Sequence, residues 1–151
     1  MAVPLVRVVA GTAKGVRLAP VPRGVRPVSD MAREGVFSSP GELVRDARVL
    51  GLYAGTGAMA IEALSRGAQH AVLVERDRAA LRTIRENVAR ARVVDAVEII
   101  ASDVGSFLTT DDKPPGGFDL VLADPPYAID EDELGSVLSS LGAGGLSGDS
   151  W

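Results

Sequence analysis

The amino-acid sequence predicts an α/β fold built on a doubly wound, mostly parallel sheet. From residue 48 onward, short apolar segments alternate with amphipathic ones. The apolar segments are hydrophobic throughout, which is typical of strands buried on both faces of a parallel sheet. The chain has 151 residues, of which 46% are hydrophobic, so it is long enough for one domain with a substantial core.

An amino-terminal unit, residues 1–40, precedes this alternation. Residues 6–10 and 16–18 are short extended patterns around a glycine-containing loop, and they predict an N-terminal β-hairpin. Prolines make residues 20–27 an extended connector. Ser29 can cap a helix that runs to about Phe37, and the Pro-Gly pair that follows ends it.

The second unit, residues 41–151, carries the strands and helices of the sheet. We expect strands at 48–53, 71–75, 97–101 and 118–123, and helices at 57–66, 77–92, 104–108 and about 131–141. In the second of these helices Leu81, Ile84 and Val88 recur at three- and four-residue spacing. A βαβαβαβ succession predicts a doubly wound sheet. After residue 141 the pattern predicts only a loop, so we expect the C-terminal strands of such a sheet to be missing.

Composition narrows the classes of function. There is no long apolar run and no export-type amino terminus, which predicts a soluble, cytoplasmic protein. The chain has no cysteine and a single histidine, so no metal site is expected. The net charge is −4, but residues 1–33 carry +5 and the remainder −9. A basic arm predicts docking of a polyanion, although the arginines could equally serve only solubility.

A glycine loop and two spaced carboxylates predict a cofactor cleft. Ala54-Gly55-Thr56-Gly57 lies between a strand and a helix, where glycines let the backbone approach a ligand. Glu75 ends the next strand and can accept hydrogen bonds from two ribose hydroxyls. Asp103, after the third strand, can accept one from an adenine amine or can simply cap the helix that follows. An adenosine-containing cofactor is predicted, and this pattern leaves nicotinamide and S-adenosylmethionine both open.

The sequence Asp124-Pro125-Pro126-Tyr127, after an apolar strand, predicts the chemistry. Two prolines stiffen the turn and leave carbonyl oxygens free. The Asp124 carboxylate and the Pro125 carbonyl can hold the two hydrogens of an exocyclic amine and direct its lone pair at a sulfonium methyl. Tyr127 offers a ring on which a base can stack. The turn therefore predicts methyl transfer to an exocyclic amino nitrogen.

With these residues the chain resembles the class I S-adenosylmethionine-dependent methyltransferases, and within them the small-subunit rRNA guanine-N2 methyltransferases of the RsmD type. The resemblance is carried by residues 7–11, 26–37, 52–58, 62–68 and 124–127. It implies a Rossmann-like sheet, S-adenosylmethionine as cofactor, and methylation of a guanine in small-subunit rRNA, free or in a 30S particle, by a monomer. It also implies cofactor binding at Tyr53, Ala54, Gly55 and Gly57. The hairpin would hold RNA, and the basic residues expected to contact phosphates are Arg7, Lys14, Arg17, Arg23, Arg26 and Arg33.

The chain departs from the family pattern at two positions. Gly51 stands where the family usually has an acid that helps order the glycine loop, and Met31 replaces a residue that is commonly basic. The alternatives are therefore another amino methyltransferase, acting on adenine N6 in DNA or on a protein glutamine, and a catalytically impaired RNA-binding remnant. A nicotinamide-dependent oxidoreductase is a more distant one.

Overall fold

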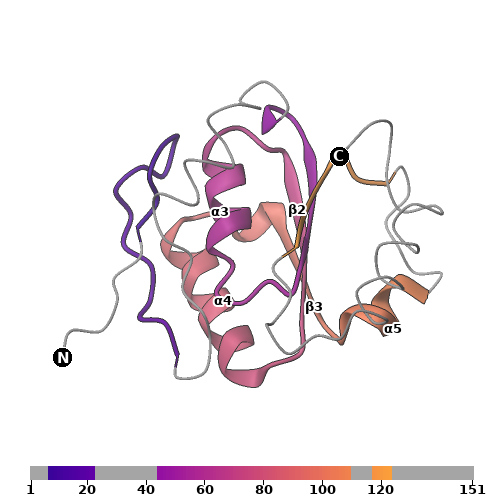
Figure 1. Cartoon of the computed structure of the whole chain (residues 1–151). Helices are drawn as coiled ribbons and strands as arrows, with labels where there is room; N and C mark the ends of the chain where they lie inside the picture. The colour runs from indigo at the N-terminus through magenta and orange to yellow at the C-terminus, as the bar shows by residue number, and fades with distance from the viewer. Residues whose placement is uncertain (1–6, 23–43, 110–116, 124–151) are drawn as a thin grey trace.

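The computed structural model describes residues 7–22, 44–109 and 117–123 (Figure 1). Its centre is a sheet of four parallel strands in the order β3-β2-β1-β4. The strands are β1 (Arg48–Leu52), β2 (His70–Glu75), β3 (Val97–Ala101) and β4 (Leu120–Ala123). The predicted doubly wound parallel sheet is confirmed. The last predicted strand begins two residues later than expected, at Leu120.

Helices cover both faces of the sheet. They are α3 (Ala58–Ser65), α4 (Arg78–Arg90), the short 3-10 helix η1 (Val94–Ala96) and α5 (Val104–Thr109). Figure 1 shows α3 and α4 on one face and α5 on the other. The chain adds β2 and β3 on one side of β1 and then places β4 on the other side. Because parallel crossovers are right-handed, reversing the direction of winding moves the connecting helix to the opposite face.

Each face of the sheet has its own apolar cluster. Residues Val49, Ala71 and Leu73 pack with α3 and α4, whereas the alternating residues Leu50 and Val72 pack with α5. Successive side chains of a strand point to opposite faces, so a strand covered on both sides must be apolar at every position. This is the pattern from which the fold class was predicted.

The predicted hairpin at residues 6–10 and 16–18 is reduced to a single antiparallel bridge, between Arg7 and Arg17. The Val8 N–H donates to the Val16 carbonyl at 3.0 Å, and the chain then turns through Gly11 and Gly15. The small hairpin that the sequence predicted is therefore present, with an antiparallel bridge in place of longer strands. The N–H groups of Val9 and Ala10 donate to a side chain of α3 instead of extending a ladder.

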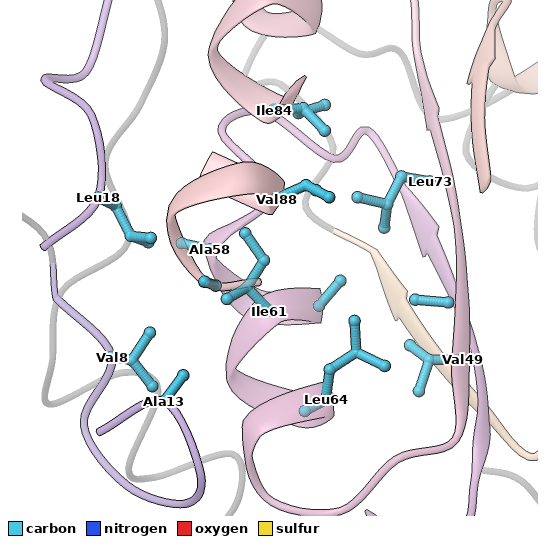
Figure 2. Close-up of a cluster of buried hydrophobic side chains, with 14 of the residues drawn as sticks. Val8, Ala13, Leu18, Val49, Ala58, Ile61, Leu64, Leu73, Ile84 and Val88 are labelled. Atoms are coloured by element: carbon cyan, nitrogen blue, oxygen red, sulfur yellow. The ribbon is translucent and has the colours of Figure 1, made fainter. Parts of the chain in front are cut away.

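Residues 7–22, which we call the arm, form a further layer outside α3 and α4 (Figure 1). In Figure 2, Val8, Ala13 and Leu18 of the arm face Ile61 and Leu64, behind which lie the strands. The arm therefore shares an apolar cluster with the sheet. The helices predicted at 29–37 and 131–141 lie outside the described residues. Within the described residues, no helix has the length and apolar character needed to cross a membrane.

Candidate functional site

The strand order reverses at β1, so a ligand site is expected at the carboxyl end of this strand. The sheet grows in one direction from β1 to β3 and in the other to β4, and ligands of such sheets bind where the order reverses. The loop of residues 53–57, which we call the glycine loop, leaves β1 at this point. Tyr53, Gly55 and Gly57 have positive φ angles of 52°, 61° and 80°. For Tyr53 this conformation costs about 1 to 3 kcal/mol, and such strain tends to gather at functional sites.

The glycine loop is tied to the end of β2. The Ala54 N–H donates to the Val74 carbonyl at 3.2 Å, and the Gly55 N–H donates to Oε1 of Glu75 at 2.8 Å. Glu75, at the end of β2, is thus held beside the glycine loop.

The carboxylate of Glu75 is already well occupied. Besides the bond from Gly55 to Oε1, its Oε2 accepts the N–H groups of Arg76 at 3.0 Å and Asp77 at 2.9 Å. A carboxylate has about four acceptor positions in total. One position, on Oε1, remains for a ligand hydroxyl if these three bonds are kept. A second hydroxyl would have to displace one of them.

Asp103 caps α5. Its Oδ1 accepts the Ser106 N–H at 2.9 Å and its Oδ2 accepts the Ser106 hydroxyl at 2.7 Å. The Ser106 hydroxyl, followed by the Ser106 N–H, holds the pKa of Asp103 below its ordinary value. The capping interpretation is therefore confirmed. The side chain is exposed beyond the end of β3, where a ligand could also reach it.

Gly51 is buried in the central strand. A Cβ at this position would lie 2.8 Å from Cδ2 of Leu73. The Leu73 side chain thus takes up space that a larger residue at position 51 would need. Because that atom is the far end of a flexible side chain, an acid could enter only if Leu73 changed rotamer.

The arm is anchored by Glu62, a residue whose role the sequence did not reveal. Glu62 is 0% exposed in the middle of α3. Its carboxylate accepts the N–H groups of Val9 at 2.9 Å and Ala10 at 3.1 Å, and it pairs with the Arg66 guanidinium at 2.8 Å. Burying a carboxylate is costly unless it has hydrogen-bond and ion-pair partners such as these. The sequence feature that could have revealed this role is an acid placed four residues before an arginine in an otherwise apolar helix.

Ser65 provides the second anchor. Its hydroxyl donates to the Ala10 carbonyl at 2.6 Å and accepts the Ala13 N–H at 2.9 Å. Its carbonyl accepts the Thr12 N–H at 2.8 Å. Gly11 passes so close that a Cβ there would lie 1.8 Å from the Ser65 carbonyl oxygen. Glu62 and Ser65, both in the stretch 62–68 that carried the family resemblance, therefore anchor the arm on α3.

Three of the predicted RNA-binding residues lie in the described part of the arm. Arg7, Lys14 and Arg17 are all exposed. Arg7 and Arg17 are opposite each other in the bridge, in a pair flanked by the Val8–Val16 hydrogen bond, so their side chains share one face. Like charges placed opposite each other repel, and an anion would relieve this. Arg90 of α4 also contacts the arm, since its Nη1 donates to the Arg17 carbonyl at 3.4 Å while its Nη2 pairs with Glu86 at 3.0 Å.

The remaining predicted residues fall outside the described part of the chain. They are Arg23, Arg26 and Arg33 of the amino-terminal unit and Asp124, Pro125 and Tyr127 of the Asp-Pro-Pro-Tyr turn. The structure describes the chain up to Ala123, the residue directly before this turn. Ala123, the last described residue of β4, is the register partner of Leu52, which directly precedes the glycine loop.

Comparison with known proteins gives a consistent family. The model of the family described as Conserved hypothetical protein 95 matches residues 6–147. Ribosomal RNA small subunit methyltransferase D of Escherichia coli (strain K12) is 36% identical over 124 residues, 81% of this chain and 60% of that protein. YlbH of Bacillus subtilis, provisionally named an rRNA methyltransferase, is 33% identical over 89% of this chain and 73% of that protein.

The fold agrees with solved structures. The E. coli protein yhhF, provisionally named a methyltransferase, superposes with a TM-score of 0.82 at 32% identity, covering 97% of this chain and 76% of that one. The chain spans about three fifths of the length of the E. coli methyltransferase D that it matches.

Proposed function

The chain belongs to the Conserved hypothetical protein 95 family, with relatives named ribosomal RNA small subunit methyltransferase D, and from this we propose that it methylates small-subunit rRNA. The reaction would be transfer of the methyl group of S-adenosylmethionine to the exocyclic N2 amine of a guanine. We place it in the cytoplasm, with a monomeric enzyme acting on rRNA that is either free or assembled into a 30S particle.

The observation that carries the proposal is the meeting of two chain segments at the carboxyl end of β1. The glycine loop begins after Leu52, and β4 ends at Ala123 in register with it. Residue 124 follows Ala123 by one peptide, which spans 3.8 Å between Cα atoms. The Asp-Pro-Pro-Tyr turn begins with the residue after Ala123, and this supports transfer from a cofactor at the glycine loop to a base at the turn.

The residues at the glycine loop suit the proposed cofactor. S-adenosylmethionine, when bound, supplies an activated methyl group on a sulfonium. The glycine loop offers backbone with no side chain at Gly55 and Gly57, and Oε1 of Glu75 keeps one acceptor position for a ribose hydroxyl. Asp103 is exposed beyond β3 and can accept a hydrogen bond from an adenine amine while it caps α5.

The role of the turn is to orient the acceptor amine. The Asp124 carboxylate and the Pro125 carbonyl accept its two hydrogens and leave the lone pair free, and Tyr127 stacks on the base. The arm supports the RNA side of the reaction through Arg7, Lys14 and Arg17. Contacts of these cations with phosphates would make RNA affinity fall as salt rises.

The test is transfer of tritiated methyl groups to 30S particles and to free rRNA from a strain that lacks the modification. Asp124→Ala should lower the rate by about a hundredfold or more while S-adenosylhomocysteine still binds, because it removes an acceptor needed only for the reacting amine. Asp95→Ala, an exposed acid of η1, is the matched control and should leave the rate unchanged.

Nucleoside analysis of the product decides the atom that is modified. N2-methylguanosine is expected, and N6-methyladenosine or a modified protein glutamine would overturn the assignment. A folded protein that bound RNA but not S-adenosylhomocysteine would be a non-catalytic RNA-binding remnant, and the proposal would then be wrong.

A further inference from the structure

Asn87 is a buried polar side chain that the proposed chemistry does not use. It lies in α4 and is 0% exposed. Its Oδ1 accepts the N–H of Ala19 at 2.6 Å, and its Nδ2 donates to the carbonyl of Thr56 at 2.9 Å. Since the first partner can only donate and the second can only accept, the orientation of the amide is fixed. The side chain at this position must accept from the Ala19 N–H and donate to the Thr56 carbonyl, and an amide can do both.

The two partners of Asn87 belong to the two sites of the proposed function. Thr56 is buried in the glycine loop between Gly55 and Gly57, both of which have positive φ. Ala19 lies in the arm, two residues after Arg17, and the arm is also held by Glu62 and Ser65 of α3 and by Arg90 of α4. Asn87 thus joins the segment expected to hold RNA to the segment expected to hold the cofactor.

The glycine loop is consequently held from two directions. Glu75 fixes the Gly55 N–H from the sheet side, and Asn87 fixes the Thr56 carbonyl from α4. If Ala19 leaves its place, Oδ1 of Asn87 loses its buried partner, and the amide is no longer constrained to face Thr56. An RNA that bound the arm only in its docked position would keep Ala19 in place and so favour the ordered loop.

We propose that Asn87 is a positioning residue through which RNA on the arm raises the affinity of the glycine loop for the cofactor. This rests on the proposed function. Coupling between two sites is reciprocal, so the cofactor also raises RNA affinity by the same factor. Ordering of a loop by a first ligand is sufficient to produce such coupling without a change of fold.

The test is calorimetric titration of S-adenosylhomocysteine into the protein, alone and saturated with transcribed small-subunit rRNA. For the wild type we expect RNA to tighten binding about fivefold or more, the lower end of typical coupling. Asn87→Ala should bring this ratio close to one. Thr83→Val is the matched control, because Thr83 is a buried residue of α4 whose hydroxyl donates only within the helix, to the Ala79 carbonyl. It should keep the wild-type ratio.

Hydrogen exchange of the wild type gives a second readout if Asn87→Ala does not fold. Amides of residues 53–57 should exchange more slowly when RNA is bound, even without cofactor. The inference is overturned if both ligands bind the wild type independently, or if Asn87→Ala keeps the ratio. Absence of any S-adenosylhomocysteine binding by the wild type would instead refute the proposed function, and this inference with it.

Discussion

The buried pair of Glu62 and Arg66 leads to a sharp stability prediction, because the protein contains a matched exposed pair. Both are Glu-Arg pairs four residues apart on neighbouring helices. The side chains of Glu62 and Arg66 are 0% and 18% exposed, and those of Glu86 and Arg90 are 53% and 40% exposed. Glu62→Ala therefore deletes a carboxylate from a buried ion pair, and Glu86→Ala deletes one from an exposed ion pair.

The loss for Glu62→Ala follows from the groups that are left behind. Without the carboxylate, the N–H groups of Val9 and Ala10 and the guanidinium of Arg66 each lose the hydrogen bond that Glu62 accepts. Breaking a buried ion pair by removing one partner costs about 3 to 5 kcal/mol. We expect about 3 kcal/mol, since Arg66 retains some contact with water. An exposed pair such as Glu86 with Arg90 contributes only about 0.3 to 0.5 kcal/mol.

Urea unfolding followed by circular dichroism measures both variants. For a chain of this size, a loss of about 3 kcal/mol lowers Tm by about 6 to 12 °C. The urea midpoint should fall for Glu62→Ala with an unchanged slope, while Glu86→Ala should be nearly silent. A loss below about 1 kcal/mol for Glu62→Ala would refute the reasoning, since the arm could then not be anchored by this carboxylate.

Two further predictions concern the arm and α5. Gly11→Ala should destabilise the protein by more than about 2 kcal/mol, because the new Cβ would overlap the Ser65 carbonyl and alanine would also have to adopt a positive φ. Gly15→Ala meets no atom within 4 Å and carries only the strain of its positive φ, about 1 to 2 kcal/mol. Equal losses of the two variants in chemical denaturation would contradict this. The Ser106 hydroxyl and N–H lower the pKa of Asp103 in the folded protein. The carboxylate of Asp103 therefore contributes its full stabilisation above the unfolded pKa of about 3.9, and this contribution is lost as the pH falls through the lower folded pKa. The difference in unfolding free energy between wild type and Asp103→Ala should thus be constant above about pH 5 and shrink below about pH 4; a difference that persisted undiminished to pH 2 would argue against the cap.

The elements of the sheet could be predicted because their signals are local. Strands such as β2 are apolar at each interior position, and α4 has its buried residues at helical spacing, so burial leaves a periodic trace in the sequence. The glycine loop and Glu75 were found in the same way, since a turn that needs positive φ favours glycine. The shortness of the hairpin pairing could not be predicted, because the extended pattern does not reveal that Glu62 binds the N–H groups of Val9 and Ala10.

The sequence by itself thus determined the fold class, the order of the elements and the place of the glycine loop. The tertiary structure decided that β4 lies beside β1, that the arm docks on α3, and that Asn87 joins the arm to the glycine loop. The physical reason is the range of the interactions. Periodicity and turn chemistry act within a few residues, whereas the bonds of Glu62 to Val9 and of Asn87 to Ala19 join residues 53 and 68 apart and exist only once the layers are packed.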